Sequence, residues 1–312
     1  MSRIFKTLLA AVIITLGTAL GFSQEKELKG NLTLSGAWAI YPTAVAWADG
    51  FQKKYPAVKV DVSAGGAGKG AADVIAGLVD IGMVSRDPDP SELKKGVFPV
   101  YILHDAVFSV VSDKNVALQD ILKKGIKKEV WNGIYVSGTV TTWDEIAGRA
   151  INKKIHVYTR SDSCGAAASW AKYLGKKQED LRGVGVYGDP GLLEAAKRDP
   201  LGIGYTNFSF VFTKDGSIIN GAKLVPIDAN GNGAADAEEV YENRDAAIKA
   251  IESGKYPATR KNYFFVKGKP NGLVKEFILF ALSEEGTKIV SETGASLPVI
   301  KTEKEKVIKG LE

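Results

Sequence analysis

The stretch Leu32–Pro42, LTLSGAWAIYP, runs from an apolar strand through small residues to a proline that suits the first turn of a helix. The same order returns in Val58–Gly70, VKVDVSAGGAGKG, and in Ile155–Trp170, IHVYTRSDSCGAAASW. A helix N-terminus offers free N–H groups and the positive end of the helix dipole, so each junction is able to hold an anion. One such junction is an ordinary βα turn. Here three junctions share the same small-residue chemistry, and one of them lies beside Arg160. We therefore predict that the three junctions converge on one small anionic ligand.

Strands and helices alternate along the chain, which is typical of an α/β fold with helices on both faces of a parallel sheet. The helix that follows Pro42 carries Ala44, Trp47 and Phe51 on one apolar face. We expect strands near residues 32–35, 58–63, 80–84, 106–112 and 155–159, with helices between them.

Two apolar strands, Ala106–Val111 and Tyr263–Val266, lie far apart in the sequence, and each is followed by a polar turn. If both cross between two lobes, residues 24–111 and 264–312 form lobe one. Residues 112–263 then form lobe two.

The N-terminus has the order of residues that is typical of a secretory signal. Arg3 and Lys6 precede an apolar run from Leu8 to Leu20, which is short for a membrane span. We therefore expect a cleaved signal peptide at residues 1–23 and a protein of the periplasm. Loss of the two cations lowers the formal charge from +5 to +3. With no basic stretch interleaved with aromatic residues, nucleic acid is not an expected partner.

Residues 228–239, DANGNGAADAEE, match the pattern of a twelve-residue calcium-binding loop, with Gly233 at the turn position six. The pattern predicts a structural calcium ion in a strand-loop-helix site, because the preceding residues 224–227 look extended. The predicted ligands are the side chains of Asp228, Asn230, Asn232, Asp236 and Glu239 and the carbonyl of Ala234.

An ordered set of motifs covers nearly all of the chain beyond the signal. They are Ser35–Pro42, 64–70, Val79–Arg86, Trp143–Gly148, Arg160–Gly165, Gly202–Tyr205, Gly254–Pro257 and Tyr263–Pro270. This set resembles the phosphate-binding periplasmic proteins that supply ABC transporters. The resemblance implies a type II periplasmic binding protein fold, with two α/β lobes joined by two extended crossings. It also implies phosphate as ligand, a membrane permease as partner and no enzymatic activity.

The resemblance places the family's ligand-binding arginine at Arg160 and its amide-rich loops at residues 39–41, 67–68 and 164–166. The ligand-binding residues implied in this way are Ala39, Ile40, Tyr41, Ala67, Gly68, Ser85, Arg160, Cys164, Gly165 and Ala166.

Several of these positions lack the side chains of the family. Ile40 replaces a threonine, Ala67 replaces a serine, and Cys164–Ala166 replaces Ser-Gly-Thr. Ser85 stands where the best-known members have an aspartate, a role open to Asp105 or Asp162 here. Each lost charge-assisted hydrogen bond costs about 1.5–3 kcal/mol. The same fold with another oxyanion or a small organic anion therefore stays an alternative to phosphate.

Cys164 is the only cysteine, so the chain forms no internal disulfide. A thiol at a helix N-terminus has a lowered pKa, which offers the alternative of an exported enzyme with Cys164 as nucleophile. Neither His104 nor His156 forms a recognisable triad pattern with it. We favour the interpretation that Cys164 is a small helix-start residue that contacts the ligand through its amide. A calcium-dependent surface protein without a transport partner is the remaining alternative.

Overall fold

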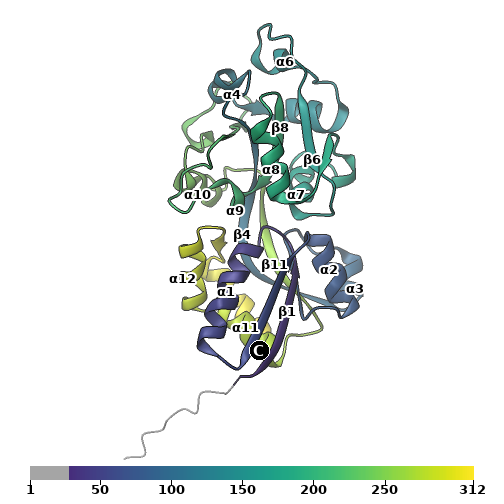
Figure 1. Cartoon of the computed structure of the whole chain (residues 1–312), viewed down its shortest axis with the longest axis vertical. Helices are drawn as coiled ribbons and strands as arrows, with labels where there is room; N and C mark the ends of the chain where they lie inside the picture. Colours follow the sequence, from purple (N-terminus) through teal and green to yellow (C-terminus); the bar gives the residue numbers. More distant parts are fainter. Residues whose placement is uncertain (1–27) are drawn as a thin grey trace, which may run out of the picture.

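The computed structural model describes residues 28–312, which form two lobes joined by long strands (Figure 1). The predicted signal peptide at residues 1–23 lies outside the described residues. Among the helices of the described part, none has the length and apolar character that a membrane span requires.

Lobe one is built from both ends of the described chain (Figure 1). Its first elements are β1 (Gly30–Gly36), α1 (Tyr41–Lys54), β2 (Val58–Ala64), α2 (Ala67–Ala76), β3 (Ile81–Val84) and α3 (Pro90–Lys94). Its last elements are α11 (Gly272–Leu282), α12 (Glu284–Thr293), β12 (Leu297–Pro298) and α13 (Lys301–Leu311).

Lobe two is continuous in sequence and contains shorter elements. The first are α4 (Leu118–Lys124), β5 (Ile126–Lys127), α5 (Lys128–Asn132), the π-helical turn η1 (Gly133–Ser137), α6 (Trp143–Ala147), β6 (His156–Arg160) and α7 (Gly165–Tyr173). Next come η2 (Gln178–Asp180), β7 (Val184–Val186), α8 (Gly188–Arg198), β8 (Gly202–Asn207), α9 (Phe208–Val211) and β9 (Ala222–Leu224). The last are β10 (Ile227–Asp228), η3 (Ala237–Glu239) and α10 (Arg244–Glu252).

Two strands, β4 (Val97–Ser112) and β11 (Thr259–Lys267), pass from one lobe to the other. They pair with each other antiparallel, and the strand order is β2-β1-β3-β11-β4-β8-β6-β7. Within each lobe the outer strands are parallel, as the alternation of strands and helices predicts. The predicted strand at 106–112 is the second half of β4, which has 16 residues.

Each lobe has its own hydrophobic core. Along each crossing strand, the side chains pack first into one of these cores and then into the other. In β4 the change falls between Leu103 and Ala106, so residues 106–111 pack in lobe two and not in lobe one. The boundary expected at residue 111 is therefore too late. Along β11 the change falls between Ala258, the residue before the strand, and Phe264.

The helix after the first junction shows how the sequence builds lobe one. Ala44, Trp47 and Phe51 of α1 are fully buried, as their spacing predicts. The Trp47 indole Nε1 donates a hydrogen bond to the Gly286 carbonyl at 2.9 Å, and Phe51 packs edge-on against Phe277 of α11. These contacts hold α1 against α11 and α12 of lobe one.

Candidate functional site

The three strand-to-helix junctions meet between the lobes. The amides of Gly65 and Gly66 in the second junction donate to the Gly36 carbonyl of the first, each at 2.9 Å. The Gly68 amide of the second junction donates to the Ser163 carbonyl of the third at 3.1 Å, and this hydrogen bond joins lobe one to lobe two. The three junctions therefore lie together, and the binding of an anion by them stays a prediction.

Gly165 lies where the two lobes approach each other closely. A Cβ atom at Gly165 would overlap the Ser85 hydroxyl and carbonyl oxygens and would lie 2.7 Å from the Ser85 carbonyl carbon. A Cβ atom at Gly66 would lie 2.7 Å from the Ser163 carbonyl oxygen and 2.8 Å from Asp162 Oδ2. Real Cβ atoms do not approach other atoms so closely, so only glycine lets the two lobes close at these points.

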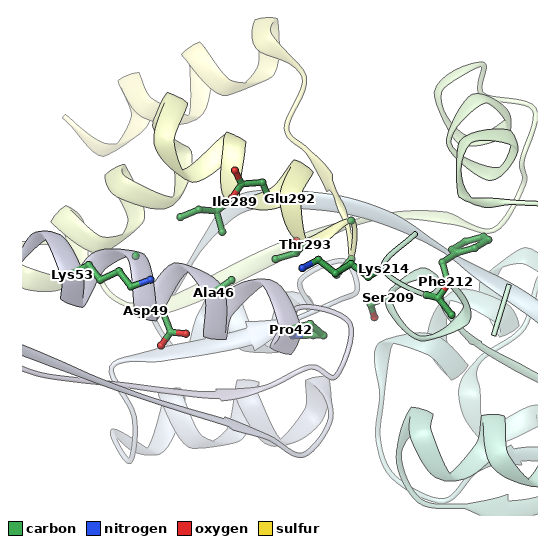
Figure 2. A pocket seen from close by; sticks show the side chains of 14 residues that line it. Pro42, Ala46, Asp49, Lys53, Ser209, Phe212, Lys214, Ile289, Glu292 and Thr293 are labelled. Carbon is green, nitrogen blue, oxygen red and sulfur yellow. The ribbon is translucent and has the colours of Figure 1, made fainter. Parts of the chain in front are cut away.

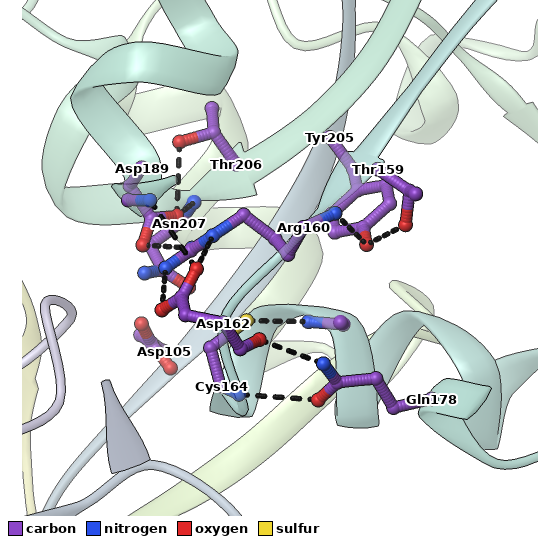
Figure 3. A network of polar contacts seen from close by, with 12 residues as sticks. Asp105, Thr159, Arg160, Asp162, Cys164, Gln178, Asp189, Tyr205, Thr206 and Asn207 are labelled. Carbon is purple, nitrogen blue, oxygen red and sulfur yellow. Dashed lines mark hydrogen bonds and ion pairs between the residues drawn. The ribbon is translucent and has the colours of Figure 1, made fainter. Parts of the chain in front are cut away.

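Arg160 lies at the end of β6 with a fully buried side chain. Its Nε and Nη2 donate to the two carboxylate oxygens of Asp162, at 2.8 and 2.6 Å, and its Nη1 donates to Asp189 at 2.5 Å (Figure 3). Burial alone would lower the pKa of Arg160, but the two carboxylates outweigh it and raise the pKa. Arg160 is therefore a fixed cation that still has N–H groups to offer, because a guanidinium carries five.

Asp189 is a member of this network that local sequence patterns did not reveal. It lies in the first turn of α8 and is 1% exposed. Its other oxygen accepts hydrogen bonds from the Thr206 hydroxyl at 3.2 Å and the Asn207 amide at 3.1 Å (Figure 3). In the sequence, Asp189 is recognisable only as an acidic residue in the first turn of a helix. That pattern is common in proteins and does not identify a partner of Arg160.

Asp105 belongs to a second buried ion pair that the sequence did not reveal. Arg260 of β11 donates from Nε and Nη2 to the two oxygens of Asp105 in β4, at 2.8 and 3.0 Å. Arg260 Nη2 also donates to the side-chain oxygen of Asn207, whose amide binds Asp189. The two arginines and three aspartates thus form one connected network. Asp105 and Asp162, the two candidates for the acidic role in the family, are each paired with an arginine.

The backbone amides expected to bind the anion differ in their availability. The amides of Ile40 and Tyr41 donate to Ala37 and Trp38 carbonyls within their own turn, and the Gly68 amide is bound to Ser163. Cys164 N–H donates to Gln178 Oε1 at 3.1 Å. These four amides therefore have acceptors within the protein in this arrangement, and their contact with an anion stays a prediction.

The helix-start amides of Gly165 and Ala166 precede the first hydrogen bond within α7 and remain candidate donors. Ala39, Ala67 and Ser85 are buried, and Ser85 lies against Gly165 of lobe two.

Cys164 is a buried thiol, not an activated one. It caps α7, and its Sγ accepts a hydrogen bond from the Ala167 amide at 3.4 Å. Burial is the main cause that raises the pKa of Cys164 to about 12, and Arg160 opposes it only in part. The expected lowering of its pKa by the helix N-terminus is wrong, because desolvation is the larger effect.

We expect Cys164 to react slowly with a maleimide in the native protein. Cys164 is 3% exposed and its thiol is protonated at neutral pH, whereas the thiolate is the reactive form. Mass spectrometry of native and denatured samples measures the difference. Full labelling of the native protein within the time needed for the denatured one would contradict the buried, protonated thiol.

A groove elsewhere between the lobes differs in chemistry from the meeting point of the three junctions. It is bounded by α1, α12 and residues 209–214, has a volume of about 590 Å³, and carries Lys53 and Lys214 beside Asp49 and Glu292 (Figure 2). None of the predicted ligand-binding residues lines it. The balanced charge does not favour an anion there.

The predicted calcium loop is folded around its acidic side chains. Asp228 is 3% exposed and accepts hydrogen bonds from the amides of Gly231, Asn232 and Gly233, at 2.7, 3.1 and 2.8 Å. Glu239 is 5% exposed and accepts from the amides of Ala229 and Asp236, at 2.8 and 3.1 Å.

The strand expected before this loop is β10, but only the three-residue turn η3 follows where a helix was expected. Within residues 28–312 no group of three or more His, Cys, Asp or Glu side chains is gathered to hold a metal ion. Calcium binding by this loop stays a prediction.

Comparison with known proteins places this geometry in a family. The model of the PBP superfamily domain matches residues 23–285. The chain belongs to the PBP superfamily. Its two lobes and two crossing strands therefore confirm the expected periplasmic binding protein fold.

Curated relatives agree in name with the resemblance in the sequence. The phosphate-binding protein PstS of Bacillus subtilis strain 168 is 28% identical, over 88% of this chain and 83% of the relative. The phosphate-binding protein PstS of Methanocaldococcus jannaschii is 25% identical, over 76% of this chain and 75% of the relative.

Solved structures share the fold. A Clostridium perfringens protein assigned to phosphate ABC transport as substrate-binding protein, solved with bound phosphate, has a TM-score of 0.70 at 23% identity, over 86% of this chain and all of that chain. An ABC-type phosphate transport receptor from Vibrio cholerae has a TM-score of 0.64 at 20% identity, with the same coverage.

Proposed function

We propose that this protein captures phosphate between its two lobes and delivers it to the membrane permease of an ABC transporter. The observation that carries the proposal is the meeting of three helix-start junctions beside the buried Arg160. The names of the PstS relatives support phosphate as the ligand and transport as the role. We also propose that the chain is exported to the periplasm by a cleaved signal peptide and that it is not an enzyme, because a solute-binding protein of this class has both properties.

The charges around the proposed site favour an anion that carries a proton. Asp105, Asp162 and Asp189 stand against Arg160 and Arg260, so the network has one more carboxylate than guanidinium. A carboxylate near the anion accepts a hydrogen bond from hydrogen phosphate but repels a fully ionised sulfate. This supports phosphate over sulfate, although the hydroxyl donors of the family are missing at Ile40, Ala67 and Ala166.

A thermal-unfolding screen of anions tests the proposal. Phosphate at a hundredfold excess over its dissociation constant should stabilise the protein by about 2.7 kcal/mol. Sulfate and small organic carboxylates at the same ionic strength should stabilise it less. A larger shift with one of those anions than with phosphate would favour the alternative ligand, and no shift with any anion would contradict a solute-binding role.

We further propose that the loop at residues 228–239 binds one calcium ion as a structural cofactor. The match to the twelve-residue pattern supports this proposal. The side chains of Asn230 and Asn232 also lie beside Asp236, and the Nδ2 group of each donates to Asp236 Oδ2, at 2.7 and 3.1 Å. Calcium would bind the side-chain oxygens of these residues and neutralise the carboxylates of Asp228, Asp236 and Glu239.

The expected result is that a chelator lowers the melting temperature of the wild type and leaves the Asp228→Ala, Glu239→Ala double variant unchanged. Ligand binding stabilises only the folded state that holds the ion, so the shift should grow with calcium concentration. Asp61→Ala, which removes an exposed carboxylate in lobe one, is the control and should keep the full response. A wild type whose melting temperature ignores calcium would disprove the site.

A further inference from the structure

The side chain of Arg260 is a buried cation with unused hydrogen-bond donors. It lies on the crossing strand β11 and is 5% exposed. Its Nε and Nη2 bind Asp105 and Asn207, but its Nη1 is buried and has no partner. A buried donor left unpaired costs free energy, so a cation kept in this state needs an explanation.

Arg260 lines a groove between the lobes that borders the proposed anion site. The groove has a volume of about 730 Å³ and is lined by Arg86, Asp87, Ser163, Ser169, Lys172 and Arg260, among others. Ser163 precedes α7, and Ser169 lies within it. At the start of α7, Gly165 approaches Ser85, which Arg86 follows directly. An anion at the α7 amides therefore lies next to the groove that Arg260 lines.

Two other cations that line the groove, Arg86 and Lys172, have carboxylate partners. Arg86 binds Glu92 at 2.6 Å, and Lys172 binds Asp87 at 2.5 Å. Arg160 donates from all three of its nitrogens to Asp162 and Asp189. Arg260 differs because both N–H groups of one nitrogen are free.

We infer that Arg260 is a second anion-binding arginine, which contacts the captured phosphate through Nη1. This inference rests on the proposed function and deepens it. Arg260 supplies donors that offset the hydroxyl groups missing at Ile40, Ala67 and Ala166. Asp105 holds the guanidinium plane from β4, so the arginine is oriented before the ligand arrives.

The test compares two variants that both lack the buried Asp105–Arg260 ion pair. Asp105→Asn keeps the guanidinium and removes its carboxylate, whereas the Asp105→Asn, Arg260→Gln double variant removes both charges. Titration calorimetry with inorganic phosphate should show at least about tenfold weaker binding by the double variant than by Asp105→Asn. Arg149→Gln, which changes an exposed arginine, should bind as the wild type does.

Equal phosphate affinity of the two Asp105 variants would overturn the inference and leave Arg260 as a clamp between the crossing strands. If the double variant does not fold, the phosphate affinity of an Arg260→Lys variant tests the inference instead. It keeps the charge but loses the free Nη1 group, so several-fold weaker binding at an unchanged melting temperature supports the inference, and unchanged affinity overturns it. The phosphate affinity of the wild type is measured first. A wild type that binds no phosphate would refute the proposed function, and not only the role of Arg260.

Discussion

Arg160→Ala should lower the free energy of unfolding by about 3–5 kcal/mol and abolish phosphate binding. The arginine side chain is fully buried between Asp162 and Asp189, which are 8% and 1% exposed. Its removal leaves two buried carboxylates without their cation. The free-energy cost of this change is far larger than the cost of removing a surface ion pair. Denaturant unfolding measures the stability, and a phosphate titration of the folded fraction measures binding.

Arg149→Ala is the matched control for this prediction. Arg149 pairs with Asp120 at 3.0 Å, but its side chain is 55% exposed, so its loss should cost under about 1 kcal/mol. Arg160→Lys keeps a charge between the carboxylates and should recover part of the stability without the bidentate geometry. An Arg160→Ala protein as stable as the Arg149→Ala protein would contradict the buried network.

Gly165→Ala should weaken phosphate binding by roughly 5–150-fold while leaving each lobe folded. The added Cβ overlaps Ser85 of the opposite lobe, and overpacking of this kind costs about 1–3 kcal/mol. Within α7 itself alanine is the better helix former by about 1 kcal/mol. The cost therefore falls on lobe closure and not on the helix.

Small-angle scattering with and without phosphate measures closure, and calorimetry measures affinity. Gly310→Ala in α13 is the control, because a Cβ there meets no atom within 4 Å. Wild-type affinity in Gly165→Ala would show that the lobes do not close at this contact.

Local patterns in the sequence predict the fold well. The apolar faces of helices such as α1 and the small residues at the junctions follow from short-range spacing, and both are present in the structure. The crossing strand β4 is longer than expected because Pro99, His104 and Asp105 interrupt its apolar run, although the sheet accommodates all three. Pairing with a second long strand decides its length, and spacing along the chain does not show that pairing.

The polar partners in the site were harder to predict. Asp105 and Arg260 are 155 residues apart, and Arg160 and Asp189 are 29 residues apart. No local motif joins them, because only the fold brings β4, β11, β6 and α8 together. The pKa of Cys164 shows the same limit, since a rule based on the helix N-terminus gives a direction that burial reverses.

Capture of phosphate at Arg160 is tested by calorimetric titration of the wild-type chain with phosphate and with sulfate, and of the Arg160→Lys variant with phosphate. We expect one phosphate bound per chain, weaker binding of sulfate, and a clear loss of phosphate affinity in the variant. Absence of phosphate binding, or full phosphate affinity in Arg160→Lys, would contradict it.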